Sequence, residues 1–96
     1  MRNVKSEPRT ILSEPYVVDL ITFVDKKGTI QALDLMSVSK SYYHMFNLAR
    51  ELEEEGILKV FEKRAPRLTY TIKLTSKGEK IAEKLQEAKE LLDGKQ

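Results

Sequence analysis

The chain has 96 residues, of which 41% are hydrophobic and 33% are charged, and it contains no cysteine. This length indicates one domain, and the composition is that of a soluble globular protein. The lack of cysteine excludes disulfides, thiolate metal sites and a thiol nucleophile. No segment resembles a signal peptide and no apolar run approaches about 18 residues, so we expect a cytoplasmic protein.

The net charge of +2 is unevenly distributed along the chain. Residues 58–80 carry seven basic and two acidic side chains, whereas residues 1–36, 37–57 and 81–96 are each neutral or net negative. A short basic block in an otherwise balanced protein is a candidate surface for contacting phosphates.

The chain is expected to begin with a flexible arm and a helix. Residues 1–12 are polar and lack periodicity, which predicts an arm that docks through Ile11 and Leu12. Ser13 is the predicted N-cap of the helix, and Leu12 and Val17 are placed to form a hydrophobic staple. Gly28 is the predicted stop. The apolar stripe of this helix is Val17, Leu20, Ile21 and Val24, and this spacing favours a helix over the strand that its β-branched residues would also allow.

The segment "GTIQALDLMSVS" predicts a brief strand at residues 29–30, one short helix at 32–36 and a turn at 37–39. A longer helix is expected from about residue 40, with Gly56 as a left-handed C-cap. Its apolar stripe is Met45, Leu48, Ala49 and Leu52, with Tyr42 packing at the edge.

The hydrophobic period then changes from 3.6 to 2. "ILKVFEK" and "RLTYTIKL" predict two strands joined by the turn "KRAPR", which makes a β-hairpin with a basic tip. In the second strand, the predicted inward-facing residues are Leu68, Tyr70, Ile72 and Leu74.

A last helix is predicted to open at Thr75 or Ser76, and Ser76 matches a capping box with Glu79. Its apolar stripe is Ile81, Leu85, Ala88 and Leu92, close to heptad spacing. A domain this small covers only the first half of such a helix, so we expect the stripe to be completed by a second copy of the chain.

Two motifs carry a resemblance to a known family. In "LARELEEEGILKV" the long helix runs into the first hairpin strand, and in "LTSKGEKIAEKL" the second strand runs into the last helix. With a basic hairpin between them, the sequence resembles small prokaryotic, especially archaeal, winged helix-turn-helix transcription regulators. The start of the long helix, "SKSYYHMF", differs from the Ser-Thr-Val-like run usual in that family.

The resemblance implies a mostly helical α+β fold with a three-helix core, a β-hairpin wing and a C-terminal helix. It divides the chain into an arm (1–12), a winged-helix DNA-binding domain (13–75) and a dimerisation helix (76–96). It also implies a homodimer that binds double-stranded DNA without a cofactor.

A helical wheel places polar side chains on the face of the long helix that lies opposite the core. Asn pairs with adenine, Arg with guanine, and Tyr stacks or contacts a thymine methyl in the major groove. The acidic residues Glu51 and Glu53–Glu55 follow on a solvated face. For His44, a surface or interhelical hydrogen bond is the alternative to a phosphate contact. The predicted major-groove residues are Lys40, Ser41, Tyr43, His44, Asn47 and Arg50; Lys63, Arg64 and Arg67 are placed on the backbone or minor groove, with added phosphate charge from Lys73 and Lys77.

Two other binding functions stay open at this point. Tyr43 and Phe46 would give a protein–protein module a small apolar patch, and the same basic residues would serve an RNA-binding winged helix. An enzyme is not expected, because one histidine, no cysteine, no glycine-rich phosphate loop and no metal-ligand spacing leave no nucleophile–base pair and no metal site. The sequence marks no small-molecule effector.

Overall fold

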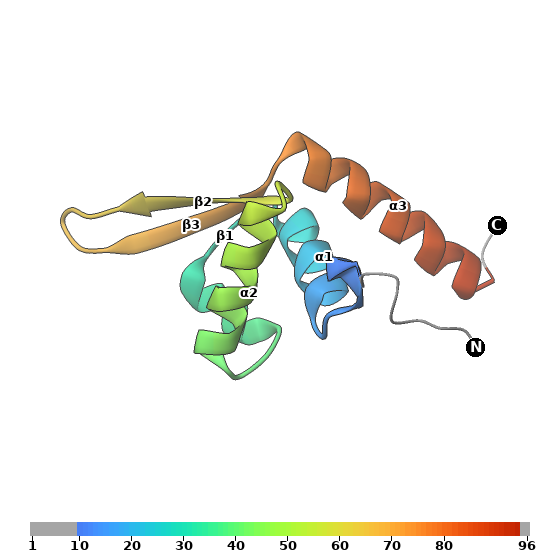
Figure 1. The fold of residues 1–96 in the computed structure, drawn as a ribbon, viewed down its shortest axis with the longest axis horizontal. Helices are drawn as coiled ribbons and strands as arrows, with labels where there is room; N and C mark the ends of the chain where they lie inside the picture. The colour runs from blue at the N-terminus through green and yellow to red at the C-terminus, as the bar shows by residue number, and fades with distance from the viewer. Residues whose placement is uncertain (1–9, 95–96) are drawn as a thin grey trace.

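The computed structural model describes residues 10–94, in which the helices pack against a small sheet and the sheet continues into a long projecting hairpin (Figure 1). The three strands are antiparallel in the order β1-β3-β2. This is the winged helix-turn-helix fold that was predicted. In chain order the elements are the 3-10 helix η2 (Ile11–Ser13), helix α1 (Val17–Lys27), strand β1 (Thr29–Gln31), the 3-10 helix η3 (Ala32–Ser37), helix α2 (Tyr42–Glu54), strands β2 (Leu58–Lys63) and β3 (Thr69–Leu74), and helix α3 (Ser76–Leu92).

The core lies where α1, α2 and the inner face of the sheet meet. The predicted stripes of both helices are confirmed, since all eight of their residues are buried. The sheet adds Ile30, Leu58 and Ile72 from its three strands. Ile11 and Leu12 pack against the edge of this core, whereas most of the predicted arm lies outside the described residues.

The prediction that Ser13 caps α1 is wrong. The Ser13 hydroxyl donates to the carbonyl of Thr10 (2.8 Å), and Glu14 is extended with ψ 145°. A residue before proline disfavours the helical region, so Pro15 delays the helix. The N-cap is Tyr16, with φ 71°. Val17 is therefore the first helical residue, and the predicted staple is wrong because Leu12 and Val17 do not stand at the N′ and N4 positions.

A compact junction joins the end of α2, both hairpin strands and the start of α3. Gly56 has φ 79° and donates to the carbonyl of Glu53, while the Ile57 amide donates to Leu52, as a left-handed C-cap requires. The N-cap of α3 is Thr75, whose hydroxyl oxygen accepts from the Gly78 amide at 2.9 Å. The helix thus opens at Thr75, one of the two predicted positions, and the predicted capping box of Ser76 and Glu79 is wrong, because Gly78 stands at N3 and has no side chain to complete a box.

The hairpin and α3 extend from opposite ends of the molecule (Figure 1). The radius of gyration is 14.9 Å, against about 12.5 Å for a compact chain of this length. Leu68 was predicted to face the core but is 52% exposed. The short strand β1 ends at Gln31, opposite Thr71, so β1 does not extend along the hairpin as far as Leu68.

Only the first half of α3 packs on the domain. Ile81 and Leu85 lie against the core, next to the buried Ala82. Ala88 is exposed, and Leu92 is 85% exposed. The second half of the predicted stripe is therefore uncovered within one copy of the chain.

Among the helices of residues 10–94, none combines the length and the apolar character that a membrane span requires.

We predict that Gly78→Ala destabilises the fold strongly, because a Cβ atom there would lie 2.1 Å from the carbonyl oxygen of Ile57. Overpacking of this kind typically costs about 1–3 kcal/mol. Urea denaturation measures the loss. The exposed neighbour Glu79→Ala is the control, and similar stabilities of the two variants would contradict the prediction.

Candidate nucleic-acid interface

The N-terminal half of α2 presents an exposed polar surface. The helix begins after Ser41, and its buried stripe leaves the opposite side open. Tyr43 is 81% exposed, more than any other aromatic side chain among the described residues. The structure brings five of the predicted major-groove residues together at this end of the helix, all of them exposed: Lys40, Ser41, Tyr43, His44 and Asn47.

His44 contacts the segment before α1. Its ring meets that of Tyr16 edge-on, with centroids 6.1 Å apart. Because Tyr16 has a left-handed backbone conformation, its ring reaches α2. His44 and Asn47 also line a small hollow with Glu14 and Pro15. This side of α2 is thus fixed by the turn that precedes α1.

Arg50 lies apart from the other predicted major-groove residues. Its guanidinium is 5.3 Å from the ring centroid of Phe46 and 5.7 Å from that of Tyr70 on β3. It also forms an ion pair of 2.8 Å with Glu53. The helical wheel placed Arg50 on the open face, but the structure places it half-buried between α2 and the hairpin.

Glu53 connects α2 to the edge of the sheet. One carboxylate oxygen accepts from Arg50, and the other accepts from the backbone amide of Val60 at 3.2 Å. Because β2 is an edge strand, this amide points away from β3 and would otherwise have no partner in the sheet. Glu53 was predicted on a solvated face, and the structure shows instead that it holds β2.

Stacked aromatic rings extend this connection toward the start of α2. Tyr42 stacks on Phe46, with centroids 5.9 Å apart, and Phe46 packs on Tyr70 at 4.9 Å. The predicted packing role of Tyr42 is confirmed. Since Phe46 lies between two rings, Tyr43 is the exposed aromatic side chain of this helix. Helix α2 and the hairpin are therefore held as one unit.

The hairpin tip is basic and exposed. Lys63, Arg64 and Arg67 lie at or next to the turn, and Arg64 pairs with Glu62. Within residues 10–94, Lys63 and Arg67 have no carboxylate at ion-pair distance. The two other lysines predicted to add phosphate charge differ in their surroundings. Lys77 donates to the carbonyl of Glu55 at 2.8 Å and so caps the end of α2. Lys73 is exposed on the sheet.

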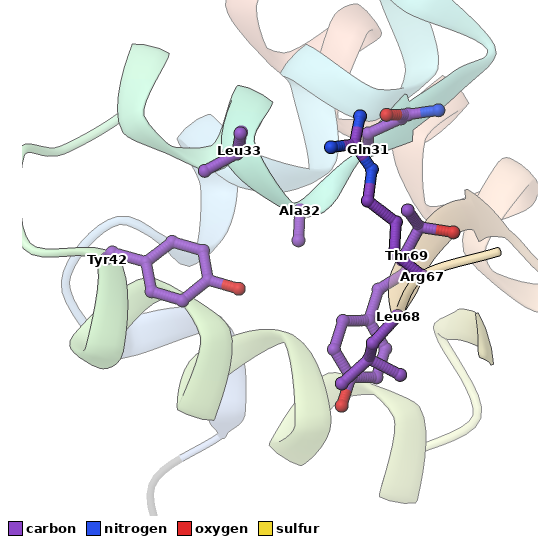
Figure 2. Close-up of a pocket in the computed structure, with 8 residues that line it drawn as sticks. Gln31, Ala32, Leu33, Tyr42, Arg67, Leu68 and Thr69 are labelled. Atoms are coloured by element: carbon purple, nitrogen blue, oxygen red, sulfur yellow. The ribbon is translucent and has the colours of Figure 1, made fainter. Parts of the chain in front are cut away.

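A concave cavity of about 480 Å³ separates the start of α2 from the hairpin. Figure 2 shows Tyr42 across this cavity from Arg67 and Leu68, with Ala32 and Leu33 of η3 forming another wall. This cavity was not predicted from the sequence; one of its lining residues, Leu33, is 74% exposed. The described residues contain no cluster of three or more histidine or acidic side chains that could hold a metal ion.

The fold is shared with a protein of known structure. The chain is similar to a transcriptional regulator homologue protein from Pyrococcus horikoshii OT3, with a TM-score of 0.74, 21% sequence identity, and coverage of 88% of this chain and 86% of that one. No family model matches the chain. No curated protein matches it in sequence.

We predict that Glu53→Ala loosens the hairpin from α2, because it removes the acceptor of the Val60 amide and the partner of Arg50. The expected loss is about 1–3 kcal/mol of unfolding free energy, with faster hydrogen exchange at the Val60 amide. The control is Glu54→Ala, which alters an exposed neighbour. Unchanged exchange at Val60 in Glu53→Ala would contradict the role assigned to this carboxylate.

Proposed function

We propose that this protein is a sequence-specific transcription regulator that binds double-stranded DNA as a homodimer. In this proposal α2 enters the major groove, and the hairpin contacts the phosphate backbone or the adjacent minor groove. The similarity in fold to a transcriptional regulator homologue supports a regulatory function in general.

One observation carries the proposal: Tyr42 at the start of α2 and Arg67 at the hairpin tip line the same cavity. The exposed start of the helix and the basic tip therefore flank one concave side of the molecule. An α-helix fits the major groove, and in helix-turn-helix proteins its N-terminal residues contact the base edges. A hairpin beside the helix then reaches the backbone of the same duplex.

The charges around α2 support this orientation. Lys40 lies at its N-terminal end, whereas the exposed acids Glu51, Glu54 and Glu55 lie at its C-terminal end. A duplex that meets the N-terminal half avoids these carboxylates. Asn47 and Tyr43 are then the residues suited to contact bases, while Lys63, Arg64 and Arg67 neutralise phosphates. Arg50, which is held by Glu53 and two aromatic rings, positions the hairpin.

The homodimer is proposed from the uncovered end of α3. Leu91 and Leu92 are 69% and 85% exposed, and Ala88 is exposed on the same half of the helix. Apolar residues at near-heptad spacing are covered when a second helix packs against them. A two-fold axis at α3 would separate the two copies of α2, so that each could read one half of a palindromic site. The two half-sites of such a site lie about 34 Å apart.

The reading role of α2 is tested by separating base contacts from phosphate contacts. Asn47→Ala is expected to cost about 1–3 kcal/mol on the preferred duplex and to relax the preference at one base pair. Arg64→Ala should weaken binding to all duplexes about equally. Sites are first selected from random duplex DNA, and affinities are then measured on selected and scrambled sequences. An equal loss on both sequences for Asn47→Ala would contradict base reading by α2.

The dimer is tested with Ala88→Glu combined with Leu92→Glu, which introduces like charges on the uncovered half of α3. Both positions are exposed in one copy of the chain, so the variant should fold. Analytical ultracentrifugation should show a dimer for the unaltered protein and a monomer for the variant. The monomer should bind a palindromic site far more weakly, because its two halves are no longer linked. An unaltered protein of monomer mass that still binds such a site tightly would contradict the proposal.

A further inference from the structure

The outer face of the sheet is uncovered and carries basic side chains without acidic ones. Side chains alternate between the two faces of a strand, and the inner face packs on the core through Val60, Ile72 and Leu74. The strand pairing sets which residues share the other face. The outer face consists of Thr29 and Gln31 from β1, Lys59, Phe61 and Lys63 from β2, and Thr69, Thr71 and Lys73 from β3.

Two lysines lie directly opposite each other on this face. Lys59 pairs in register with Lys73, and both are exposed. Like charges in this relation destabilise a sheet. Among the ion pairs within residues 10–94, none involves either lysine. An anionic ligand would remove this repulsion. Lys63 extends the positive charge about 14 Å further along β2, at 3.4 Å per residue.

Phe61 lies between these lysines. It is paired with Thr71 and is 47% exposed. The ring contacts among the described residues involve other aromatic side chains, so no aromatic ring stacks on the exposed part of Phe61. An exposed aromatic ring flanked by lysines and threonines provides stacking for a base, charge for phosphates and hydroxyl groups for hydrogen bonds.

We propose that this outer face binds single-stranded nucleic acid, with a base stacked on Phe61 and phosphates at Lys59, Lys63 and Lys73. A single strand fits better than a duplex, because the bases of a duplex are already stacked and paired and cannot reach the ring. The site lies on the face of the sheet opposite to α2, so it is separate from the proposed major-groove surface and shares only Lys63 with the proposed duplex contacts of the hairpin. DNA and RNA single strands offer the same chemistry.

The test uses the full chain with fluorescent 15-nucleotide oligo-dT and oligo-U, and a duplex selected for binding. Phe61→Ala should weaken binding of the single strands about 5- to 150-fold, the equivalent of one lost base–aromatic stack, and leave duplex affinity unchanged. Phe61→Tyr should retain single-strand affinity. Leu68→Ala, which removes an apolar side chain of similar exposure outside the proposed site, is the matched control and should have no effect on single strands.

The lysines are tested by Lys59→Gln with Lys73→Gln. This variant should melt at the same or a higher temperature, because it removes a like-charge pair, yet the slope of log affinity against log salt should become shallower by about 1.4. Lys80→Gln with Lys89→Gln, an equal charge change on α3, is the control. A preference for oligo-dT or oligo-U identifies DNA or RNA as the source of the strand.

Three results would overturn the proposal. The first is that the unaltered chain binds neither oligonucleotide at 50 mM salt. The second is an equal loss of single-strand affinity in Phe61→Ala and Leu68→Ala, and the third is a loss of duplex affinity in Phe61→Ala that parallels its loss of single-strand affinity. A change from dimer to monomer in Phe61→Ala would show instead that this face is a contact between copies. Loss of base reading in Asn47→Ala tests α2 alone and leaves this site unaffected.

Discussion

The hydroxyl group of Thr75 occupies the point on which the arrangement of the elements depends. It donates a hydrogen bond toward the carbonyl oxygens of Gly56 and Ile57 and accepts a hydrogen bond from the amide of Gly78. The Thr75 amide also donates to Ile57 at 3.0 Å. One residue thus joins the end of α2, the start of β2, the end of β3 and the start of α3. The directions of the hairpin and of α3, which leave the core on opposite sides, are both set at this junction.

A second set of contacts keeps α2 and the hairpin in a fixed relation at a distance from that junction. Phe46 and Tyr70 pack ring against ring, Arg50 lies over both, and Glu53 holds Arg50 and the Val60 amide together. Buried apolar contacts alone would allow the hairpin to tilt, because its outer half lies beyond the core. The directional contacts fix its angle, so a surface that spans α2 and the hairpin tip is preformed.

The sequence was sufficient for features that depend on one element alone. The buried stripes of α1 and α2 follow from helical spacing, and the left-handed Gly56 follows from its place after the last helical turn. Features that depend on two distant segments were missed. A helical wheel of α2 does not include Tyr70, so it placed Arg50 and Glu53 in solvent. The local pattern allowed Thr75 or Ser76 as the cap of α3, and the carbonyls at residues 56–57, which accept from the Thr75 hydroxyl, favour Thr75. The lysine pair of the outer face becomes visible only once the hairpin register is known.

The hydrogen bond that the Val60 amide donates to Glu53 also bears on the tendency of the protein to aggregate at high concentration. An edge strand with unpaired amides is a template on which other chains can add strands, which leads to aggregation. At the outer edge of β2 that position is occupied by a carboxylate of the same chain. The opposite edge belongs to β1, which is only three residues long. The blocked Val60 amide and the short β1 each leave a neighbouring chain fewer backbone groups to pair with, which lowers the tendency of the sheet to add strands from other copies at high protein concentration.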